Sequence, residues 1–591
     1  MNILGISCFF HDAAAALLQD GVLTAAAEEE RFSRKKHDYG FPERAIDFCL
    51  HAGKVRGQDL DLVVFFEKPF LKFDRILRSV MSTFPHSRGV FQESMIAWMT
   101  EKLWIKGRIR HKLGVDESKI FFSDHHLSHA ASAFLCSPFD EAAILTVDGV
   151  GEWATATYGI GRGSDIRVLR EIRFPHSLGL LYSAFTAFLG FEVNEGEYKV
   201  MGMAPFGRPR YVDKVWKLVN QESDGSFRLN MDYFTFHRST HQTYGGKFVE
   251  LFGTPRDPAA HFFTPSSGHP SYFGARPASY DALARQNQHY ADVAASIQRV
   301  TEEMLLKMTS HLHRETGLKR LCLAGGVALN SVANGRILRE TPFEELFIQP
   351  AAGDGGGALG AALVGCHMVL GKPRDFVLRH AYWGQEFSAG DVDTFVRSNN
   401  IAHTRLEDDD RLLGRVVEHL QSGKVVGWFQ GRFELGPRAL GNRSILADPR
   451  NPAMKDIVNT KIKFREPFRP FAPSVLVERA SEFFDLTEAH RHHPARYMLY
   501  VVDVKDGQRE RIPAVTHVDG TARLQTVDAE SAPRYWRLIH TFGQATGAPV
   551  LLNTSFNLKG EPIVNTPAEA FSTFSRSGMD VLVMGQHVVE K

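Results

Sequence analysis

The stretch of residues 141–161, EAAILTVDGVGEWATATYGIG, decides the fold class. Residues 144–147 are mostly apolar and mostly β-branched, which predicts a buried strand that ends at Asp148. A glycine-rich turn follows, and we expect residues 154–161 to return as a second strand. A buried strand that leads into a glycine turn and a hairpin is typical of an α/β domain with ligand loops at its strand ends.

The same pattern recurs on both sides of this stretch. Residues 2–29 contain two apolar runs with Gly21 where a hairpin turn is expected. Residues 320–324 form a predicted strand that runs into Gly325 and Gly326, and residues 346–349 form another that runs into the segment PAAGDGGGALGAA. The N-terminal part is therefore predicted to be a split α/β domain.

A second domain is expected after a boundary near residues 371–384. Beyond it, a helix near residues 410–422 leads into the strand KVVGWFQ and then into a motif-dense segment at residues 431–470. Residues 253–290 are rich in Pro, Gly and Ser, which favours a long loop or lid over a boundary. We therefore predict two domains, residues 1–375 and 376–591.

The composition excludes several classes of protein. Of the 591 residues, 43% are hydrophobic and 23% are charged, with 69 Lys and Arg against 68 Asp and Glu, so an extended basic face for nucleic acid is not expected. The five cysteines are widely spaced, which argues for a reducing compartment and against a thiolate zinc site. No apolar run has the length of a membrane span, so we expect a cytoplasmic protein that does not enter the membrane.

The segment FSDHHLSHA, residues 122–130, concentrates histidines at the start of a predicted helix. Asp124 is a suitable N-cap, and the helix would place His125 and His129 on one face, with His126 pointing elsewhere. Such a pair can hold a divalent ion, although histidines near a helix start can also simply face solvent.

Two carboxylates can complete a metal site with this pair. Asp148 and Asp354 each follow an apolar strand beside glycines, a position from which side chains point into a shared crevice. Two histidines and two aspartates suit iron, manganese or zinc. The alternative for Asp148 is a turn residue, because Asp-Gly is a common turn dipeptide. Similarly, Gly325 and Gly326 either let a phosphate or a base approach the backbone or form a tight packing turn.

The C-terminal part carries a dense set of cationic and amide side chains beside glycines and prolines. Cations held in such turns suit a small phosphorylated ligand, while a solvated basic face or an RNA surface are the alternatives. Polar side chains that end the apolar strand near residue 552 could share the same ligand. The residues concerned are Arg438, Arg443, Lys461, Lys463, Arg465, Arg469, Arg523, Asn553, Ser555 and Asn557.

Taken together, the motifs resemble those of the O-carbamoyltransferase family, which includes nodulation and antibiotic-tailoring enzymes such as the tobramycin and cephamycin carbamoyltransferases. The resemblance covers essentially the whole chain. The motifs that carry it are FHDAAAAL, EEERFSRKKHDYGFP, DHHLSHAASAF, VDGVGEW, GEYKVMGMAPFG, GGVALN, GPRALGNRSILADPR, KFREPFRPFAPSVL, HVDGTARLQTV and NTSFNLKGEPIV.

The resemblance implies a fold and a reaction. The N-terminal domain resembles the threonylcarbamoyl-transferring domain of tRNA modification, in the actin and sugar-kinase ATPase superfamily, and the C-terminal domain resembles its adenylate-forming partner. The C-terminal domain would use ATP, with Mg²⁺, to convert carbamoyl phosphate into carbamoyl adenylate, and the N-terminal domain would transfer the carbamoyl group to a hydroxyl of a small molecule, most simply a secondary metabolite. A homodimer is compatible with this reading. A small-molecule kinase and a tRNA-modifying enzyme are the alternatives.

The resemblance also implies roles for individual residues. Phe9 stands where the aminoglycoside enzyme has an acidic residue, which argues against an aminoglycoside acceptor. The implied metal, Fe²⁺ in the family, would be held by His125, His129, Asp148 and Asp354, and His11 would lie near the acceptor hydroxyl. The nucleotide is expected near Lys36, Lys199, Gly325, Gly326 and Asn330, and carbamoyl phosphate on Arg438, Lys463, Arg469, Arg523, Asn553 and Ser555.

Overall fold

The chain forms two compact units. A computed structural model describes residues 1–591, with every side chain except that of Ser271. The first unit contains residues 1–25 and 39–377, and the second contains residues 26–38 and 378–591. The chain leaves the first unit two residues beyond the predicted division. The short segment 26–38 belongs to the second unit, although it lies within the sequence of the first. A single boundary in the sequence cannot describe this arrangement.

The first unit contains two sheets with the same topology. In the first sheet, of order β3-β2-β1-β4-β5, β2 is antiparallel to β1, and β4 and β5 run parallel to β1. In the second, β7 and β8 form an antiparallel meander with β6, and β11 and β12 run parallel to β6. The strands are β1 (Asn2–Ser7), β2 (Ala14–Gln19), β3 (Val22–Glu28), β4 (Leu62–Phe65), β5 (Ile120–Phe122), β6 (Glu141–Val147), β7 (Ala154–Arg162), β8 (Asp165–Arg173), β11 (Arg320–Ala324) and β12 (Glu345–Phe347).

This duplicated arrangement confirms the predicted α/β class of the N-terminal domain. The predicted hairpin turn is also present, because Gly21 adopts a φ of 84° between β2 and β3. In both sheets, parallel strands end on the side where the chain turns into a helix. Ligand-binding side chains of such sheets gather at that edge.

Glycines allow helix α13 (Gly357–Leu363) to pack closely against its neighbours. A Cβ atom on Gly5 of β1 would lie 1.9 Å from the carbonyl oxygen of Ala358, and one on Gly360 would lie 1.8 Å from that of Ser128 in α6 (His125–Phe134). Backbone packing thus explains part of the glycine run GDGGGALG. It also fixes Asp354, which lies just before α13, relative to α6.

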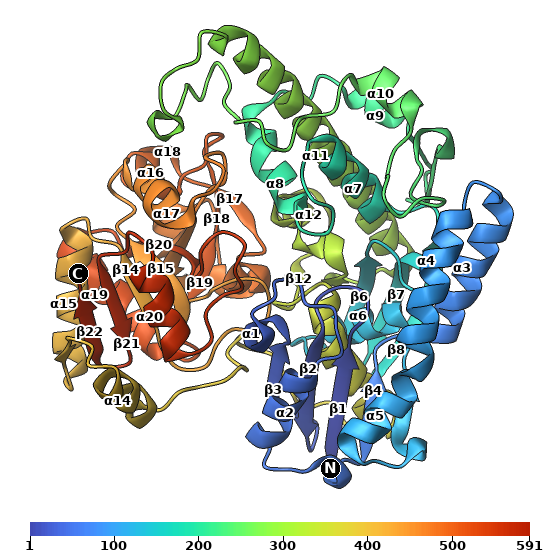
Figure 1. The fold of residues 1–591 in the computed structure, drawn as a ribbon, viewed down its shortest axis with the longest axis horizontal. Helices are drawn as coiled ribbons and strands as arrows, with labels where there is room; N and C mark the ends of the chain where they lie inside the picture. The colour runs from blue at the N-terminus through green and yellow to red at the C-terminus, as the bar shows by residue number, and fades with distance from the viewer. The chain divides into compact units, whose positions relative to one another are not determined.

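Long helices and an irregular segment cover the rest of the first unit. Helix α11 (Tyr280–Thr316) follows residues 253–279, which contain little regular structure. Helices α3 (Pro69–Thr83) and α4 (Arg88–Thr100) lie side by side as a hairpin (Figure 1). In the described part of the chain, no helix combines the length and apolar character that crossing a membrane requires.

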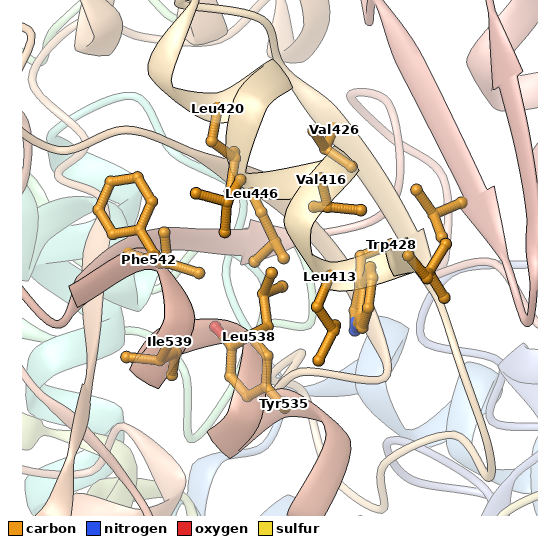
Figure 2. Close-up of a cluster of buried hydrophobic side chains, with 14 of the residues drawn as sticks. Leu413, Val416, Leu420, Val426, Trp428, Leu446, Tyr535, Leu538, Ile539 and Phe542 are labelled. Carbon is orange, nitrogen blue, oxygen red and sulfur yellow. The ribbon is translucent and has the colours of Figure 1, made fainter. Parts of the chain in front are cut away.

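The second unit is built on an eight-stranded mixed sheet of order β13-β22-β21-β14-β15-β20-β16-β19. Helices α15 (Asp409–Gln421) and α19 (Pro533–Thr546) pack their apolar residues on this sheet, and Figure 2 shows side chains of both helices around Trp428. The strands are β13 (Thr404–Arg405), β14 (Val426–Phe429), β15 (Arg443–Ala447), β16 (Ala472–Leu476), β19 (Gln525–Val527), β20 (Val550–Ser555), β21 (Val581–Met584) and β22 (His587–Glu590).

The core of the second unit also fixes a loop that carries candidate site residues. Trp428 is fully buried in β14, and its indole Nε1–H donates to the carbonyl oxygen of Gly441 at 2.8 Å. Gly441 adopts a φ of 110°, and a Cβ atom there would lie 2.3 Å from the ring of Tyr535. The loop from residue 436 to 443 is therefore held against the core at a point where only glycine fits.

Candidate functional site

Two histidines and two aspartates of the first unit meet at one point. The Nε2 atoms of His125 and His129 are 3.0 Å apart. Asp148 Oδ2 lies 3.2 Å from His125 Nε2 and 3.8 Å from His129 Nε2, and Asp354 Oδ1 lies 3.7 and 3.4 Å from the same two atoms. The structure thus brings together all four residues that were predicted as metal ligands.

The cluster is closed off from solvent. His125 and His129 are 0% and 1% exposed, and Asp148 and Asp354 are 6% and 5% exposed. Burial by itself would lower the pKa of His129, but hydrogen bonds and charges from Asp148 and Asp354 outweigh it and raise that pKa to about 9. Burial would raise the pKa of Asp148, but the two histidines hold it well below its usual range. His129 and Asp148 therefore stabilise each other's charged forms.

These residues fit a divalent metal. For bonds of about 2.0–2.2 Å in a tetrahedral site, neighbouring ligand atoms lie roughly 3.3–3.6 Å apart, and the measured separations of 3.0–3.8 Å bracket that range. Asp354 Oδ2 is buried and has no hydrogen-bond partner among the described groups. Two imidazoles and two carboxylates form a donor set that suits iron, manganese or zinc.

Local structure orients the ligands. Asp148 follows β6, and its Oδ1 accepts a hydrogen bond of 2.8 Å from the backbone N–H of Gly326, which leaves Oδ2 facing the histidines. Asp124 occupies the N-cap position of α6, as predicted, but its side chain makes no cap hydrogen bond and instead pairs with Lys68 at 2.9 Å. The carboxylate of Glu152 accepts from the first helical N–H group, that of His125, at 3.0 Å. This role of Glu152, as the acceptor at the start of α6, was not predicted from the sequence.

His126 lies apart from the cluster, as expected from the helix geometry. Its Nδ1 lies 2.6 Å from the hydroxyl of Thr146, and its Nε2 lies 2.9 Å from the carbonyl oxygen of Ala154. Burial, followed by the charges of His125 and His129, lowers the pKa of His126 to about 3. Both ring nitrogens are engaged, so His126 is a buried structural histidine.

His11 lies on a strained segment after β1. Its Nδ1 is 2.7 Å from Asp12 Oδ2, and its Nε2 is 2.9 Å from the carbonyl oxygen of Asn194. Burial opposes the charged form, yet the hydrogen bond and charge of Asp12, with a smaller contribution from Asp354, raise the pKa of His11 to about 9. Phe9 and Asp12 both have positive φ angles, of 67° and 38°. Such strain is common at functional sites.

The residues predicted near the nucleotide are distributed over different elements. Gly325 has a φ of 94°, and a Cβ atom there would lie 2.3 Å from the carbonyl oxygen of Val147. Asn330 caps α12 (Ser331–Glu340) and hydrogen-bonds Gln298. Together with the bond from Gly326 to Asp148, these contacts match the alternative of a tight packing turn. Lys199 lies on α8 (Glu197–Met203). Lys36 belongs to the segment 26–38 of the second unit, and the nucleotide role of all five residues stays a prediction.

In the second unit, three other arginines lie close enough to Arg523 to repel its charge. Arg523 ends β18 (Thr521–Arg523), which pairs with β17 (Val501–Asp503). Burial lowers the pKa of Arg523 well below its usual range, and repulsion by Arg438, Arg465 and Arg469 lowers it further. The Nε atom of Arg523 is buried and has no hydrogen-bond partner among the described groups. A partly buried group of like charges of this kind is suited to an anion.

Lys463 lies next to these arginines. Burial, and then the charges of Arg465 and Arg469, lower its pKa well below the usual range. Its Nζ donates to Ser555 at both the carbonyl oxygen and the hydroxyl, and to Asn557 Oδ1 at 2.7 Å. The predicted residues Arg438, Arg469, Arg523, Lys463 and Ser555 are thus linked by contacts or by mutual electrostatic effects.

Asn553 takes part in a buried network behind this region. Its Nδ2 donates to Gln525 Oε1 at 2.8 Å and to Ser474 Oγ at 3.1 Å, whereas its Oδ1 is buried without a partner among the described groups. Gln525 in turn donates to the carbonyl oxygen of Leu440 at 2.8 Å. Asn553 therefore supports the same loop, residues 436–443, that carries Arg438.

Two buried acidic residues that sequence reasoning missed shape that loop. Glu434 is fully buried, and its Oε1 accepts from the N–H groups of Leu440, Asn442 and Arg443. Glu28, in the segment 26–38, accepts from Gly436 N–H at 2.6 Å. Glu28 begins the motif EEERFSRKKHDYGFP, but no role was predicted for either residue. A carboxylate two positions before Gly436, where the loop begins, was the available signal for Glu434.

Arg443 has a structural role. Its guanidinium is fully buried and donates to the carbonyl oxygens of Gln430 and Gly431, and it lies 3.7 Å from the ring centroid of Phe429. Burial lowers its pKa to about 9, although Glu434 opposes this effect. The sequence grouped Arg443 with the other cations, but in the structure it holds backbone carbonyls.

These two sites lie within regions that match known protein families. A family model described as the carbamoyltransferase N-terminus matches residues 2–363, and one described as the carbamoyltransferase C-terminus matches residues 417–591. The protein belongs to the carbamoyltransferase family and is an enzyme of that class. The family resemblance inferred from the motifs is thereby confirmed.

Particular relatives are similar over nearly the whole chain. The nodulation protein NolNO of Sinorhizobium fredii is 39% identical over 593 residues, which cover 99% of this chain and 79% of that protein. The 3'-hydroxymethylcephem-O-carbamoyltransferase of Streptomyces clavuligerus is 37% identical over 573 residues, 94% of this chain and 92% of that protein. A solved structure, that of T. kodakarensis HypF, matches 62% of this chain and 48% of its own chain at 15% identity, with a TM-score of 0.32.

Proposed function

We propose that the protein uses ATP and carbamoyl phosphate to carbamoylate a hydroxyl group of a small-molecule acceptor, a secondary metabolite. The observation that carries the proposal is the partly buried group of four arginines, Arg523 with Arg438, Arg465 and Arg469, which suits a small phosphorylated substrate. The relative named for O-carbamoyl transfer to a 3'-hydroxymethylcephem supports an alcohol as the acceptor.

In the first step, the second unit would make carbamoyl adenylate. Water cleaves the P–O bond of carbamoyl phosphate, which releases inorganic phosphate and leaves carbamate. An oxygen of carbamate then attacks the α-phosphorus of ATP, supplied with Mg²⁺, and pyrophosphate leaves. Arg438, Arg469 and Arg523 would bind the phosphate group, because guanidinium forks form charge-assisted bonds with phosphate oxygens. Lys463 would hold Ser555 in place next to these arginines through its hydrogen bonds to that residue.

In the second step, the first unit would transfer the carbamoyl group. The acceptor hydroxyl oxygen attacks the carbamoyl carbon, the C–O bond to AMP breaks, and the hydroxyl proton is released to a base. His11 is held by Asp12 and Asn194, and at neutral pH its raised pKa favours the protonated ring. His11 would therefore orient the reacting groups through hydrogen bonds at pH 7 and could accept the proton only as the pH approaches 9.

The metal site belongs to this second step. His125, His129, Asp148 and Asp354 would hold a divalent ion, Fe²⁺ by analogy with the family. When bound, such an ion supplies Lewis-acid polarisation and a template for the substrate. Gly326 and Glu152 would keep the ligand side chains in place through the hydrogen bonds described above.

The proposal is tested with purified protein, ATP, carbamoyl phosphate and a panel of alcohols. Pyrophosphate release should require both ATP and carbamoyl phosphate, and the modified alcohol should gain the mass of one carbamoyl group. A gain of one phosphoryl group would identify a kinase instead. Carbamoylation of tRNA rather than of any alcohol would identify the other alternative.

A further inference from the structure

Arg75 is a buried cation that neither of the two sites described above uses. It lies on α3, is 7% exposed, and its Nη1 has no hydrogen-bond partner among the described groups. Its guanidinium carbon lies 5.0 Å from the ring centroid of Phe174. A buried guanidinium nitrogen without an acceptor is costly, and an anionic partner would remove that cost.

Two lysines accompany Arg75. Lys72 Nζ lies 2.6 Å from Glu67 Oε2, and Lys102 Nζ lies 4.0 Å from Glu67 Oε1. Burial, and next the positive charge of Lys72, lower the pKa of Lys102 to about 8. Burial likewise lowers the pKa of Arg75 to about 10, although Glu67 and Glu152 oppose this effect.

The acidic residues near these cations are largely committed. Glu67 is 1% exposed and is shared between Lys72 and Lys102. Glu152 uses its Oε1 to accept from the backbone N–H groups of Lys68 and His125. Neither carboxylate makes an ion pair with Arg75 within 4.0 Å among the described residues. The cluster therefore contains more positive than negative charge, and the guanidinium of Arg75 has no carboxylate partner among the described residues.

The cluster lies beside the proposed transfer site. Lys72 Nζ is 4.3 Å from the ring centroid of Phe10, which is 38% exposed and precedes His11 in sequence. On the other side, Glu152 binds the backbone N–H of His125, a proposed metal ligand. An acceptor whose hydroxyl reaches His11 could therefore place a second group near Arg75.

We propose that Arg75, supported by Lys72 and Lys102, binds a carboxylate of the acceptor, so that the alcohol carbamoylated by this protein is a hydroxy acid. The inference rests on the proposed function, because it names the acceptor class of that reaction. A guanidinium fork matches the two oxygens of a carboxylate, and exclusion of water strengthens the pair. A neutral acceptor would leave Arg75 without a partner.

The alternative is that Arg75 only packs the α3–α4 hairpin against Phe174. The two roles predict opposite effects on stability. If the partner of Arg75 is a ligand, the buried arginine is unpaired in the free protein and destabilises it. R75M, which conserves the apolar stem, should then leave the melting temperature unchanged or raise it. A purely structural arginine should lower the melting temperature when it is replaced.

The experiment compares hydroxy acids with their uncharged counterparts. The probes are 3-(hydroxymethyl)benzoate against 3-(hydroxymethyl)benzamide, together with aliphatic hydroxy acids against their amides, and the readout is the mass gain of one carbamoyl group. The wild-type protein should prefer the acid by about 10- to 100-fold in kcat/KM, the range expected for one charge-assisted pair. R75M should reduce this preference to within about 3-fold, and R75K should give an intermediate value.

A matched control is R78Q, one turn along the same helix, where Arg78 is exposed and pairs with Asp74. R78Q should keep the acid preference. The inference is overturned if the wild-type protein carbamoylates acids and amides alike or no acid at all, or if R75M keeps the preference while its melting temperature falls by more than about 5 °C. Pyrophosphate release by the wild-type protein distinguishes a failure of the inferred acceptor class from a failure of the proposed function. If pyrophosphate is released but acids are not preferred, only the acceptor class is wrong. If no pyrophosphate is released, the proposed function is wrong.

Discussion

The metal cluster of the first unit is buried and the arginine cluster of the second is partly buried, and the two clusters differ in charge balance. At the metal cluster, Asp148 and Asp354 lie within 3.8 Å of both imidazole rings, so the site carries its own counter-charges. Around Arg523, the charges that act on its pKa are those of other arginines. The difference supports the proposal that the first cluster binds a cation and the second an anion.

The largest effect should come from removing the central arginine. Arg523→Ala is expected to lower kcat/KM for carbamoyl phosphate by about 100- to 1,000-fold, because one preorganised donor to a developing charge is lost. Arg397→Ala, which removes an exposed arginine of the same unit, is the control. If the two variants use carbamoyl phosphate equally well, the arginine cluster does not bind this substrate.

Two neighbouring histidines sharpen the comparison at the metal cluster. His129→Ala should lose bound divalent metal, measured by elemental analysis, and lower carbamoyl transfer by about 100-fold. His126→Ala should keep the metal but lose about 3 kcal/mol of stability, because two buried hydrogen bonds and side-chain volume are removed. Equal metal content in His129→Ala and the wild-type protein would contradict the assignment of the ligands.

A smaller effect is expected from the carboxylate that shapes the arginine loop. Glu434→Gln keeps the accepting Oε1 but removes the charge, so three charge-assisted bonds to backbone N–H groups become neutral ones. We expect about a 10-fold rise in KM for carbamoyl phosphate and an unchanged metal content. A fall in metal content would show that the two clusters are not independent.

The last expected effect concerns the pH dependence of stability and not the activity. The pKa of His11 rises from 6.5 to about 9 on folding, so the folded state binds its proton more tightly. The associated stability is fully present below pH 6.5 and is lost as the pH rises through about 9. Since His11 is partly exposed, we expect about 2 kcal/mol, measured as the difference between the urea unfolding free energies of wild type and His11→Gln at pH 6 and pH 9.5. A constant difference would mean that Asp12 does not stabilise the charged ring.

The sequence predicted the metal cluster better than the surroundings of the arginine cluster, for a physical reason. His125 and His129 are fixed by helical spacing, and Asp148 and Asp354 by strand ends, so local patterns are enough to place them. The loop of Arg438 depends instead on Glu28 and Glu434, whose positions follow from tertiary packing. The same limit applies to Arg443, which was grouped with the substrate cations although it binds backbone carbonyls.

The fold was also predictable only in part. Alternating glycine turns and apolar strands indicated the α/β class and both ends of β11. Two features lay beyond local pattern: the repeated topology of the two sheets, and the inclusion of residues 26–38 in the second unit. Both depend on contacts between distant parts of the chain, which hydrophobic periodicity does not encode.

The central claim is that the two clusters serve different steps, and the most direct test is exchange of radioactive pyrophosphate into ATP in the presence of carbamoyl phosphate. This exchange reports formation of carbamoyl adenylate without any acceptor. We expect Arg523→Ala to lose the exchange and His129→Ala to keep it within about 3-fold of wild type while failing to carbamoylate an alcohol. Equal loss of exchange in both variants would contradict the account.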